Sequence, residues 1–143
     1  MPIREESYDL FGAASGSPSV YSYEKAVSTS ANGSITGNAL DLRSPKPALV
    51  DEYRIKIDIT TAITGLSGTD GITATILTCD TNSATAGDWK TIITGAKITT
   101  FTKGTPVLRA RLPQDCKRWI KAVITNAGTA TGGKVGGNVE PIV

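Results

Sequence analysis

A stretch that looks like a P-loop, GTATGGKV at residues 128–135, is the clearest chemical motif in this sequence. Its first glycine, four further residues, Gly133 and Lys134 reproduce most of the pattern that cradles nucleotide phosphates. A P-loop also needs a hydroxyl after the lysine for magnesium, and a helix whose N-terminus faces the phosphates. Val135 occupies the hydroxyl position, and the GGNVEP that follows cannot begin a helix. We therefore expect no nucleotide binding, and a hairpin turn in which Gly132 and Gly133 adopt backbone angles that other residues avoid.

The polar loop at residues 80–88 is a second candidate site. Asp80, Asn82 and Asp88 offer the oxygen ligands that calcium prefers, but their spacing is not that of an EF-hand. A solvated turn is the alternative, and the simpler one. Trp89, directly after this loop, could be a platform on which a sugar stacks, or it could pack over a neighbouring strand, which is the commoner role of such a residue.

Catalytic and metal chemistry is restricted by what the sequence lacks. It has no histidine, which excludes Ser-His-Asp and Cys-His catalysis and histidine-ligated zinc. Cys79 and Cys116 cannot form a four-thiolate site; we expect two small buried residues, with a disulfide between them as the alternative. Arg109 and Arg111 lie on one face of a predicted strand and, with no nucleophile to serve, fit an interface or a solvent-exposed face. We assign no catalytic, cofactor-binding or metal-binding residue, and expect neither enzyme activity nor a cofactor.

Length and charge restrict the partners. The 143 residues suit one domain, and the net charge is only +2, with 15 basic and 13 acidic residues interspersed. This distribution lacks the concentrated basic face that nucleic-acid binding requires. No apolar run approaches the roughly 20 residues of a membrane span, and the N-terminus lacks a signal-peptide pattern. We expect synthesis in a cytosol, no membrane residence and no nucleic-acid partner.

The strongest structural signal is the alternation in EYRIKIDITTAI, residues 52–63. Apolar residues at every second position predict a strand with one buried and one solvent-exposed face. The residues expected to face the core are Tyr53, Ile55, Ile57, Ile59, Ile72, Ile76, Leu108, Trp119, Ile120 and Val123.

Shorter patterns of the same kind predict a fold made almost entirely of strands. The further predicted strands are residues 20–27, 34–36, 38–42, 72–79, 89–93, 97–101, 106–112, 118–125 and 134–143. We expect eight or nine of these ten segments to form strands. With no long helix, they indicate an all-β, jelly-roll-like β-sandwich that forms a single domain over residues 20–143. Residues 1–19 lack periodicity and predict a flexible N-terminal arm outside the sandwich, with a short helix around Glu5–Phe11.

Several of these pieces together resemble a known family. They are the Asn38–Leu42 step, the strand end at Thr78–Asp80, Trp89 after the polar loop, the Leu112-Pro113 turn, the Arg118-Trp119 strand start, and the Gly128–Gly133 turn. Across residues 25–140 this pattern resembles the small jelly-roll cementing, or decoration, proteins of tailed bacteriophage heads.

The resemblance implies a structural virion protein on the capsid exterior, synthesised in the cytoplasm of a bacterial host. It implies that the partner is the major capsid protein and that the protein staples neighbouring capsid subunits together. A homo-oligomer is expected, with a dimer favoured over a trimer. The alternative function is a non-enzymatic carbohydrate-binding or adhesive module, whose aromatic platform would have to come from Trp89, Tyr21 and Tyr23.

Overall fold

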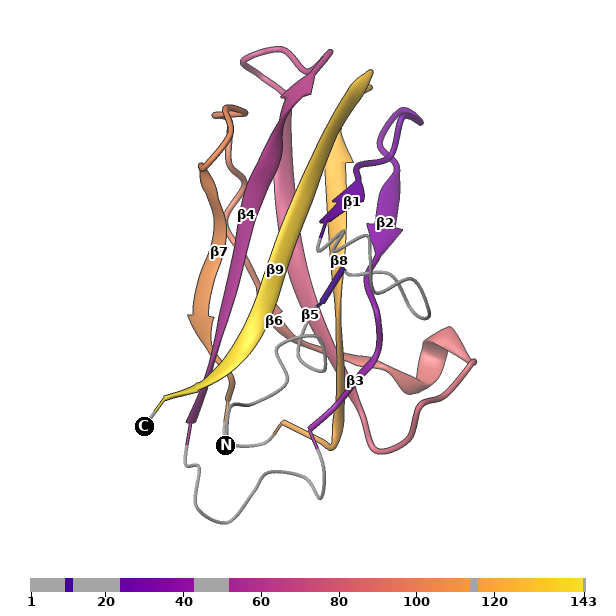
Figure 1. The fold of residues 1–143 in the computed structure, drawn as a ribbon. Helices are drawn as coiled ribbons and strands as arrows, with labels where there is room; N and C mark the ends of the chain where they lie inside the picture. The colour runs from indigo at the N-terminus through magenta and orange to yellow at the C-terminus, as the bar shows by residue number, and fades with distance from the viewer. Residues whose placement is uncertain (1–9, 12–23, 43–51, 114–115, 143) are drawn as a thin grey trace, which may run out of the picture.

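The chain folds into a sandwich of two antiparallel β-sheets (Figure 1). The computed structural model describes residues 10–11, 24–42, 52–113 and 116–142. Within them lie nine strands and one short 3-10 turn, so the predicted all-β sandwich is confirmed. The elements are β1 (Glu24–Ala26), β2 (Ser34–Thr36), β3 (Leu40–Asp41), β4 (Glu52–Thr64), β5 (Gly71–Cys79), η2 (Ala86–Asp88), β6 (Lys90–Thr94), β7 (Pro106–Arg111), β8 (Trp119–Ala127) and β9 (Gly132–Ile142).

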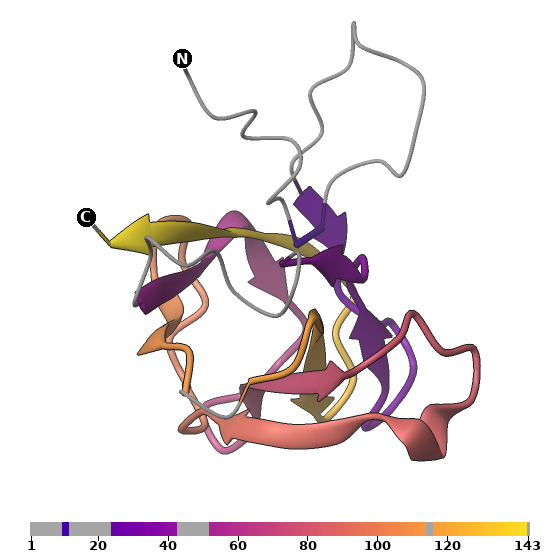
Figure 2. The ribbon, with the colours of Figure 1, turned by 90° about the horizontal axis from the view of Figure 1, so that it is seen from below.

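The order of the strands is that of a jelly roll. One sheet, sheet A, runs β1-β9-β4-β7; the other, sheet B, runs β2-β8-β5-β6, with β3 also paired to β8. β1 thus pairs with β9, and β2 and β3 pair with β8. β4 pairs with β7, and β5 pairs with β6. This is a long hairpin rolled up on itself. Most consecutive strands therefore lie in opposite sheets, whereas β5 and β6 pair within sheet B. Figure 2 shows the two layers from below.

Strands β2 and β3 act as two pieces of one edge strand of sheet B. Thr36 pairs with Val123, and Leu40 pairs with Ile120. Four steps along the edge therefore match three steps along β8, so that the strand bulges by one residue between the two pieces.

The inward face of β4 is the one that the alternation predicts. Tyr53, Ile55, Ile57 and Ile59 are all buried between the sheets. β4 holds this position through pairing on both sides, with β9 along its whole length and with β7 from Arg54 to Asp58. The other predicted core residues that are buried are Ile72, Ile76, Leu108 and Ile120.

Trp119 and Val123 correct the predicted core. Both lie on the outer face of sheet B, where Trp119 pairs with Cys79 and Val123 pairs with Thr75, and both are half-buried. The reason is the strand period of two: once Ile120 faces the core, its odd-numbered neighbours must face outward.

The predicted strand at residues 97–101 is also wrong. Only Ile98 pairs there, in an isolated bridge to Ile72 with hydrogen bonds of 3.0 and 2.9 Å. The glycine at position 71 fits this crossing, because a Cβ there would lie 2.2 Å from the Lys97 side chain.

The N-terminal prediction needs a correction at two residues. Leu10 and Phe11 are 0% and 3% exposed, within the core rather than outside the sandwich. The Leu10 N–H donates to the Gly137 carbonyl on β9 at 3.0 Å, and the Leu10 carbonyl accepts from the Asn38 N–H at 2.7 Å. This short piece of chain therefore bridges the two sheets. Leu10 and Phe11, the last two residues of the predicted helix Glu5–Phe11, form a bend and not a helix. The rest of that helix and of the predicted arm lies outside the described residues.

Replacing Ile57 with Ala should lower the free energy of unfolding by about 2–5 kcal/mol, because it leaves a cavity between the sheets. Urea unfolding measures the loss. Lys90→Ala, on an exposed strand position, is the control and should change stability by less than about 0.5 kcal/mol. A loss below about 1 kcal/mol for Ile57→Ala would contradict the assignment of the buried face.

Removing residues 1–18 should destabilise the sandwich, because the deletion takes two buried side chains and two inter-sheet hydrogen bonds with it. Leu10→Ala alone should cost about 2–5 kcal/mol. The measurement is the urea midpoint of both variants against the full chain. A truncated protein that unfolds at the same midpoint would show that Leu10 and Phe11 add nothing to the core.

Candidate functional site

The P-loop-like stretch is a connection between the two sheets. β8 ends at Ala127 in sheet B, and β9 begins at Gly132 in sheet A, so the predicted hairpin is wrong. The positive φ angles belong to Gly128 (107°) and Gly133 (117°), and Gly132 has none. β9 follows where a P-loop has its helix, and the Lys134 ammonium lies 3.4 Å from the Glu24 carboxylate. This geometry offers no helix N-terminus for a phosphate.

Packing explains why glycines occupy this connection. A Cβ at Gly128 would lie 2.5 Å from the Asp70 carboxyl carbon, and one at Gly133 would lie 2.5 Å from the Ile63 Cα. The buried Asn126 amide donates to the carbonyls of Gly128 (2.9 Å) and Ser30 (3.3 Å). These contacts tie the β8–β9 connection to its neighbouring turns, so the glycines have a structural role.

The Asn32-Gly33 turn completes this end of the sandwich. Asn32 adopts a φ of 53°, and its side-chain oxygen accepts from the Gly128 N–H at 2.9 Å. The Asn32 N–H donates in return to the Gly128 carbonyl at 3.0 Å. Two turns that are distant in the sequence are thus joined by reciprocal hydrogen bonds.

The polar loop at residues 80–88 is ordered by its own side chains. The Ser83 hydroxyl donates to the Asp88 carboxylate, and the Trp89 indole N–H donates to the Ser83 carbonyl at 3.0 Å. Across the described parts of the chain, no group of three or more acidic, cysteine or histidine side chains is placed to hold a metal ion.

Trp89 packs over the outer face of sheet B. Its side chain is 7% exposed, and the Lys121 ammonium lies 4.2 Å from the ring centroid, a cation–π contact. Of the two alternatives that the sequence offers, packing over a neighbouring strand is therefore the correct one. A ring that is covered in this way has no free face for a sugar.

A second charged contact closes the lower end of sheet B. Arg118 donates from Nε and one terminal nitrogen to both carboxylate oxygens of Asp41, each at 2.7 Å. These hydrogen bonds, and the charge of Asp41, raise the pKa of Arg118. The guanidinium carbon also lies 5.8 Å from the Trp119 ring centroid. The pair fixes β3 to the start of β8, which is a structural role.

Cys79 and Cys116 form no disulfide and are both buried, as the first of the two interpretations predicts. Cys116 lies beside the buried Thr78 hydroxyl, 3.8 Å from its oxygen. That hydroxyl accepts from the Lys117 N–H and donates to the Trp119 carbonyl, both at 2.9 Å. Thr78 thus anchors the turn that leads into β8.

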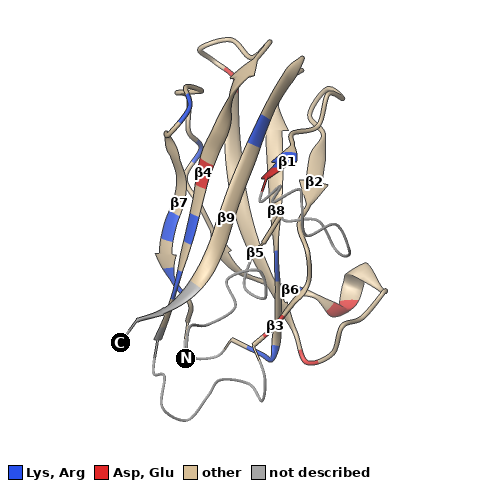
Figure 3. Cartoon of the chain, in the orientation of Figure 1, with Lys and Arg blue, Asp and Glu red and all other residues tan. Residues whose placement is uncertain are grey.

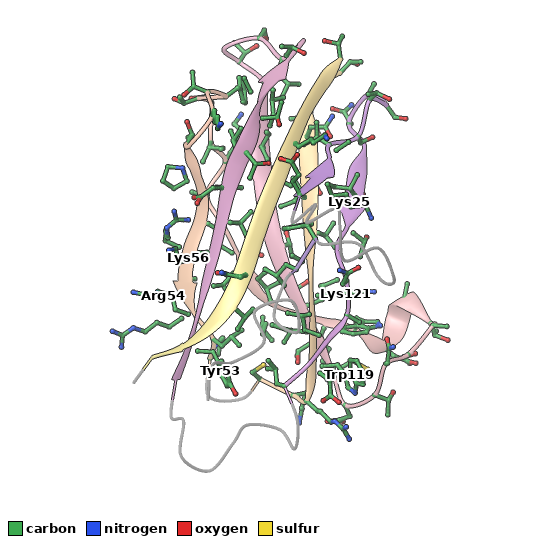
Figure 4. The ribbon with its side chains drawn as sticks, in the orientation of Figure 1. Lys25, Tyr53, Arg54, Lys56, Trp119 and Lys121 are labelled. Atoms are coloured by element: carbon green, nitrogen blue, oxygen red, sulfur yellow. The ribbon has the colours of Figure 1, made fainter. Side chains whose placement is uncertain are left out.

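The surface feature that stands out is a group of four cations on the outer face of sheet A, which we name the cation cluster. It consists of Arg54 and Lys56 on β4, and Arg109 and Arg111 on β7. Arg54 pairs with Arg111 and Lys56 pairs with Arg109 across the two strands (Figure 3). Figure 4 shows Arg54 and Lys56 on this side of the molecule, with Trp119 and Lys121 on the other.

The type of strand pairing brings these like charges close together. The Leu112 N–H donates to the Tyr53 carbonyl at 2.8 Å, which makes that pair a hydrogen-bonded one. Pairs alternate in an antiparallel ladder, so both cation pairs are of the non-hydrogen-bonded type, in which Cα atoms lie about 4.5 Å apart. Asp58 forms an ion pair with Arg109. Like charges directly opposite each other weaken a sheet, but Asp58 accompanies Arg109 here, and on its other side Arg54 lies in register with Glu140 of β9.

The sequence reveals only half of this cluster. The alternation places Arg109 and Arg111 on one face, and Arg54 and Lys56 on the exposed face of another strand. The sequence does not indicate which strands are neighbours or in what register they pair.

No model of a known protein family matches this sequence. A search among curated proteins gives no match either. Within the described segments, no helix has the length and hydropathy to cross a membrane. The function is therefore argued from the surfaces of the sandwich.

Titration with ATP and magnesium should release no heat and leave the melting temperature unchanged, because the β8–β9 connection lacks the P-loop geometry. Gly133→Ala should nevertheless lower stability by more than about 1 kcal/mol, since alanine is strained at a positive φ. An affinity for ATP that disappears in Lys134→Ala would contradict this assignment.

Proposed function

We propose that this chain is a structural virion protein, a decoration protein that binds the outer surface of a bacteriophage capsid with the major capsid protein as its partner. The observation that carries the proposal is the cation cluster, an outer sheet face on which cationic residues of β4 and β7 lie directly opposite one another. The jelly-roll strand order and the resemblance of residues 25–140 to cementing proteins support the same role.

The physical basis of cementing is multivalency. When each copy contacts more than one capsid subunit, weak contacts add up through their high effective concentration. We propose that the protein acts as a homo-oligomer, with a dimer favoured over a trimer, because closed symmetric assemblies are most often two-fold. The open edges of the sandwich are the natural places for such contacts, since an edge strand carries unpaired backbone groups.

The alternative, a carbohydrate-binding or adhesive module, has less support. It needs an exposed aromatic platform, and Trp89 is covered by its loop and by Lys121. Tyr21 and Tyr23 lie outside the described residues. We likewise propose that the chain is not an enzyme, because the sequence has no histidine and therefore no Ser-His-Asp or Cys-His arrangement.

Heads of the virus that encodes this chain, assembled without it, should bind the purified protein saturably in a co-sedimentation assay. Bound heads should resist heating or osmotic shock better than bare heads. Heads of an unrelated phage are the control and should bind far less. A protein that leaves its own heads unbound, and that binds a glycan array instead, would contradict the proposal and favour the carbohydrate-binding alternative.

A further inference from the structure

The outer face of sheet B differs from that of sheet A in its lack of charge. The two central strands can be compared directly, because each is paired on both sides and buried on its inner face. β4 turns Arg54, Lys56 and Asp58 outward, whereas the whole of β5, GITATILTC, is uncharged (Figure 3). The uncharged surface is therefore a property of one sheet and not of the whole sandwich.

The strand register assembles this surface into two rows of side chains, which we name the hydroxyl face. The first row is Ser34, Thr125 and Thr73, and the second is Thr36, Val123, Thr75 and Thr94. All of these residues but Val123 carry a hydroxyl. In the described part of the chain, none of these hydroxyls has a hydrogen-bond partner.

Two charged side chains border the hydroxyl face, and both have partners. The Lys121 ammonium, lower on the same side of the molecule (Figure 4), lies 4.2 Å from the Trp89 ring centroid. The Lys25 ammonium donates to the Thr36 carbonyl at 2.7 Å. Both ammonium groups are thus held at the border of the face.

We propose that the hydroxyl face binds a second copy of this chain across a two-fold axis. In such an interface the same patch meets itself, so its groups must be complementary to their own copies. A hydroxyl is both a donor and an acceptor, and a methyl group packs against a methyl group, so threonine meets this requirement. The inference deepens the homo-oligomer proposed above and rests on it, but it does not depend on capsid binding.

The outer face of sheet A does not meet the same requirement. Two copies packed through it would bring one cation cluster against the other, and like charges placed together in an interface cost several kcal/mol. Of the two outer faces that the described strands form, that of sheet B is therefore the one suited to self-association.

The size of the face favours a weak dimer. Packed sheets lie about 10 Å apart, and small threonine side chains allow that approach. Four strands about 4.8 Å apart, with the nine residues of β8, give a plane of roughly 14 by 27 Å. Its area, on the order of 400 Å², is smaller than the roughly 800 Å² that each partner buries in a standard interface. We therefore expect a dimer that dissociates on dilution.

A weak dimer is sufficient for multivalent binding. Each copy keeps its cation cluster and its open sheet edges outside the contact, so the dimer offers two copies of every other surface. Binding of one copy to a capsid would then raise the effective concentration of the second.

Threonine on an exposed strand can also reflect only its preference for β-structure. That explanation accounts for threonine on either sheet. It does not account for the absence of charge along a central strand, or for the half-buried Val123 in the middle of the face. A second copy accounts for both, because it would cover Val123 and would exclude charge from the contact.

The test is analytical ultracentrifugation of the full-length protein from micromolar to millimolar concentration. It should show a monomer–dimer equilibrium that changes little as salt rises, because the contact is uncharged. Thr75→Lys should weaken dimerisation by about tenfold or more, since it opposes like charges in the middle of the face. Thr100→Lys adds the same charge at an exposed loop position outside the face and should leave dimerisation unchanged.

A mixture of variants separates a lost contact from a lost fold. Thr75→Asp alone should also be monomeric, whereas Thr75→Asp mixed with Thr75→Lys should form a dimer with one copy of each, because opposite charges then meet. An unfolded variant could not be rescued in this way. Urea unfolding of each variant is the control, and Thr125→Lys, at an exposed position of the same face, repeats the test if position 75 does not tolerate a charge.

Several results would overturn the proposal. They are a full-length protein that stays monomeric at millimolar concentration, a dimer that both Thr75→Lys and Thr125→Lys leave intact, and no dimer in the mixture of folded variants. A dimer that dissociates as salt rises would assign the contact to charged surfaces instead. A Thr75→Lys variant that still dimerises but no longer binds heads would assign the hydroxyl face to the capsid.

The oligomer and the capsid role can fail separately. Dimerisation that behaves as expected, in a protein that leaves heads unbound, would contradict only the capsid role. Head binding by a protein that stays monomeric would contradict only the two-fold contact.

Discussion

The pairing of β4 with β9 is the interaction on which the rest of the sandwich depends. β4 lies in the middle of sheet A, and β9 extends along nearly all of it, from Glu52 opposite Ile142 to Thr64 opposite Gly132. β1 attaches to the far side of β9 and β7 to the far side of β4. The buried isoleucines of β4 face sheet B because this ladder fixes the rotation of the strand. Without it, sheet A would have no centre.

The cation cluster shows how such a scaffold can place residues of like charge directly opposite one another. Cross-strand pairs of like charge cost stability, on the order of a few tenths to 1 kcal/mol each. A ladder that is bonded on both sides and packed against a core can tolerate that cost. The same ladder fixes the backbone positions of the four cationic residues.

The sequence predicts the strands well because each carries its own signal. Tyr53 to Ile59 alternate so strictly that both the strand and its buried face follow from the residues. The register between distant strands has no such local signal. The sequence therefore predicts the charged face of each strand but not that β4 and β7 lie side by side. The β8–β9 connection was predicted to be a hairpin because consecutive strands usually pair, whereas this jelly roll places β8 and β9 in opposite sheets. Leu10 and Phe11 escaped prediction because two apolar residues show no period.

The pairing of first with last strand also determines when the fold can form. A ribosome adds residues from the N-terminus, so β1 and β4 emerge long before β9, with which both of them pair. Until residues 132–142 are free of the ribosome, β4 has only β7 beside it, and sheet A is incomplete. Folds with such distant contacts usually reach the native state in milliseconds to seconds, and their exposed strands are prone to aggregation meanwhile. In this chain the outer face of β4 carries charged residues, which water can solvate before β9 is present.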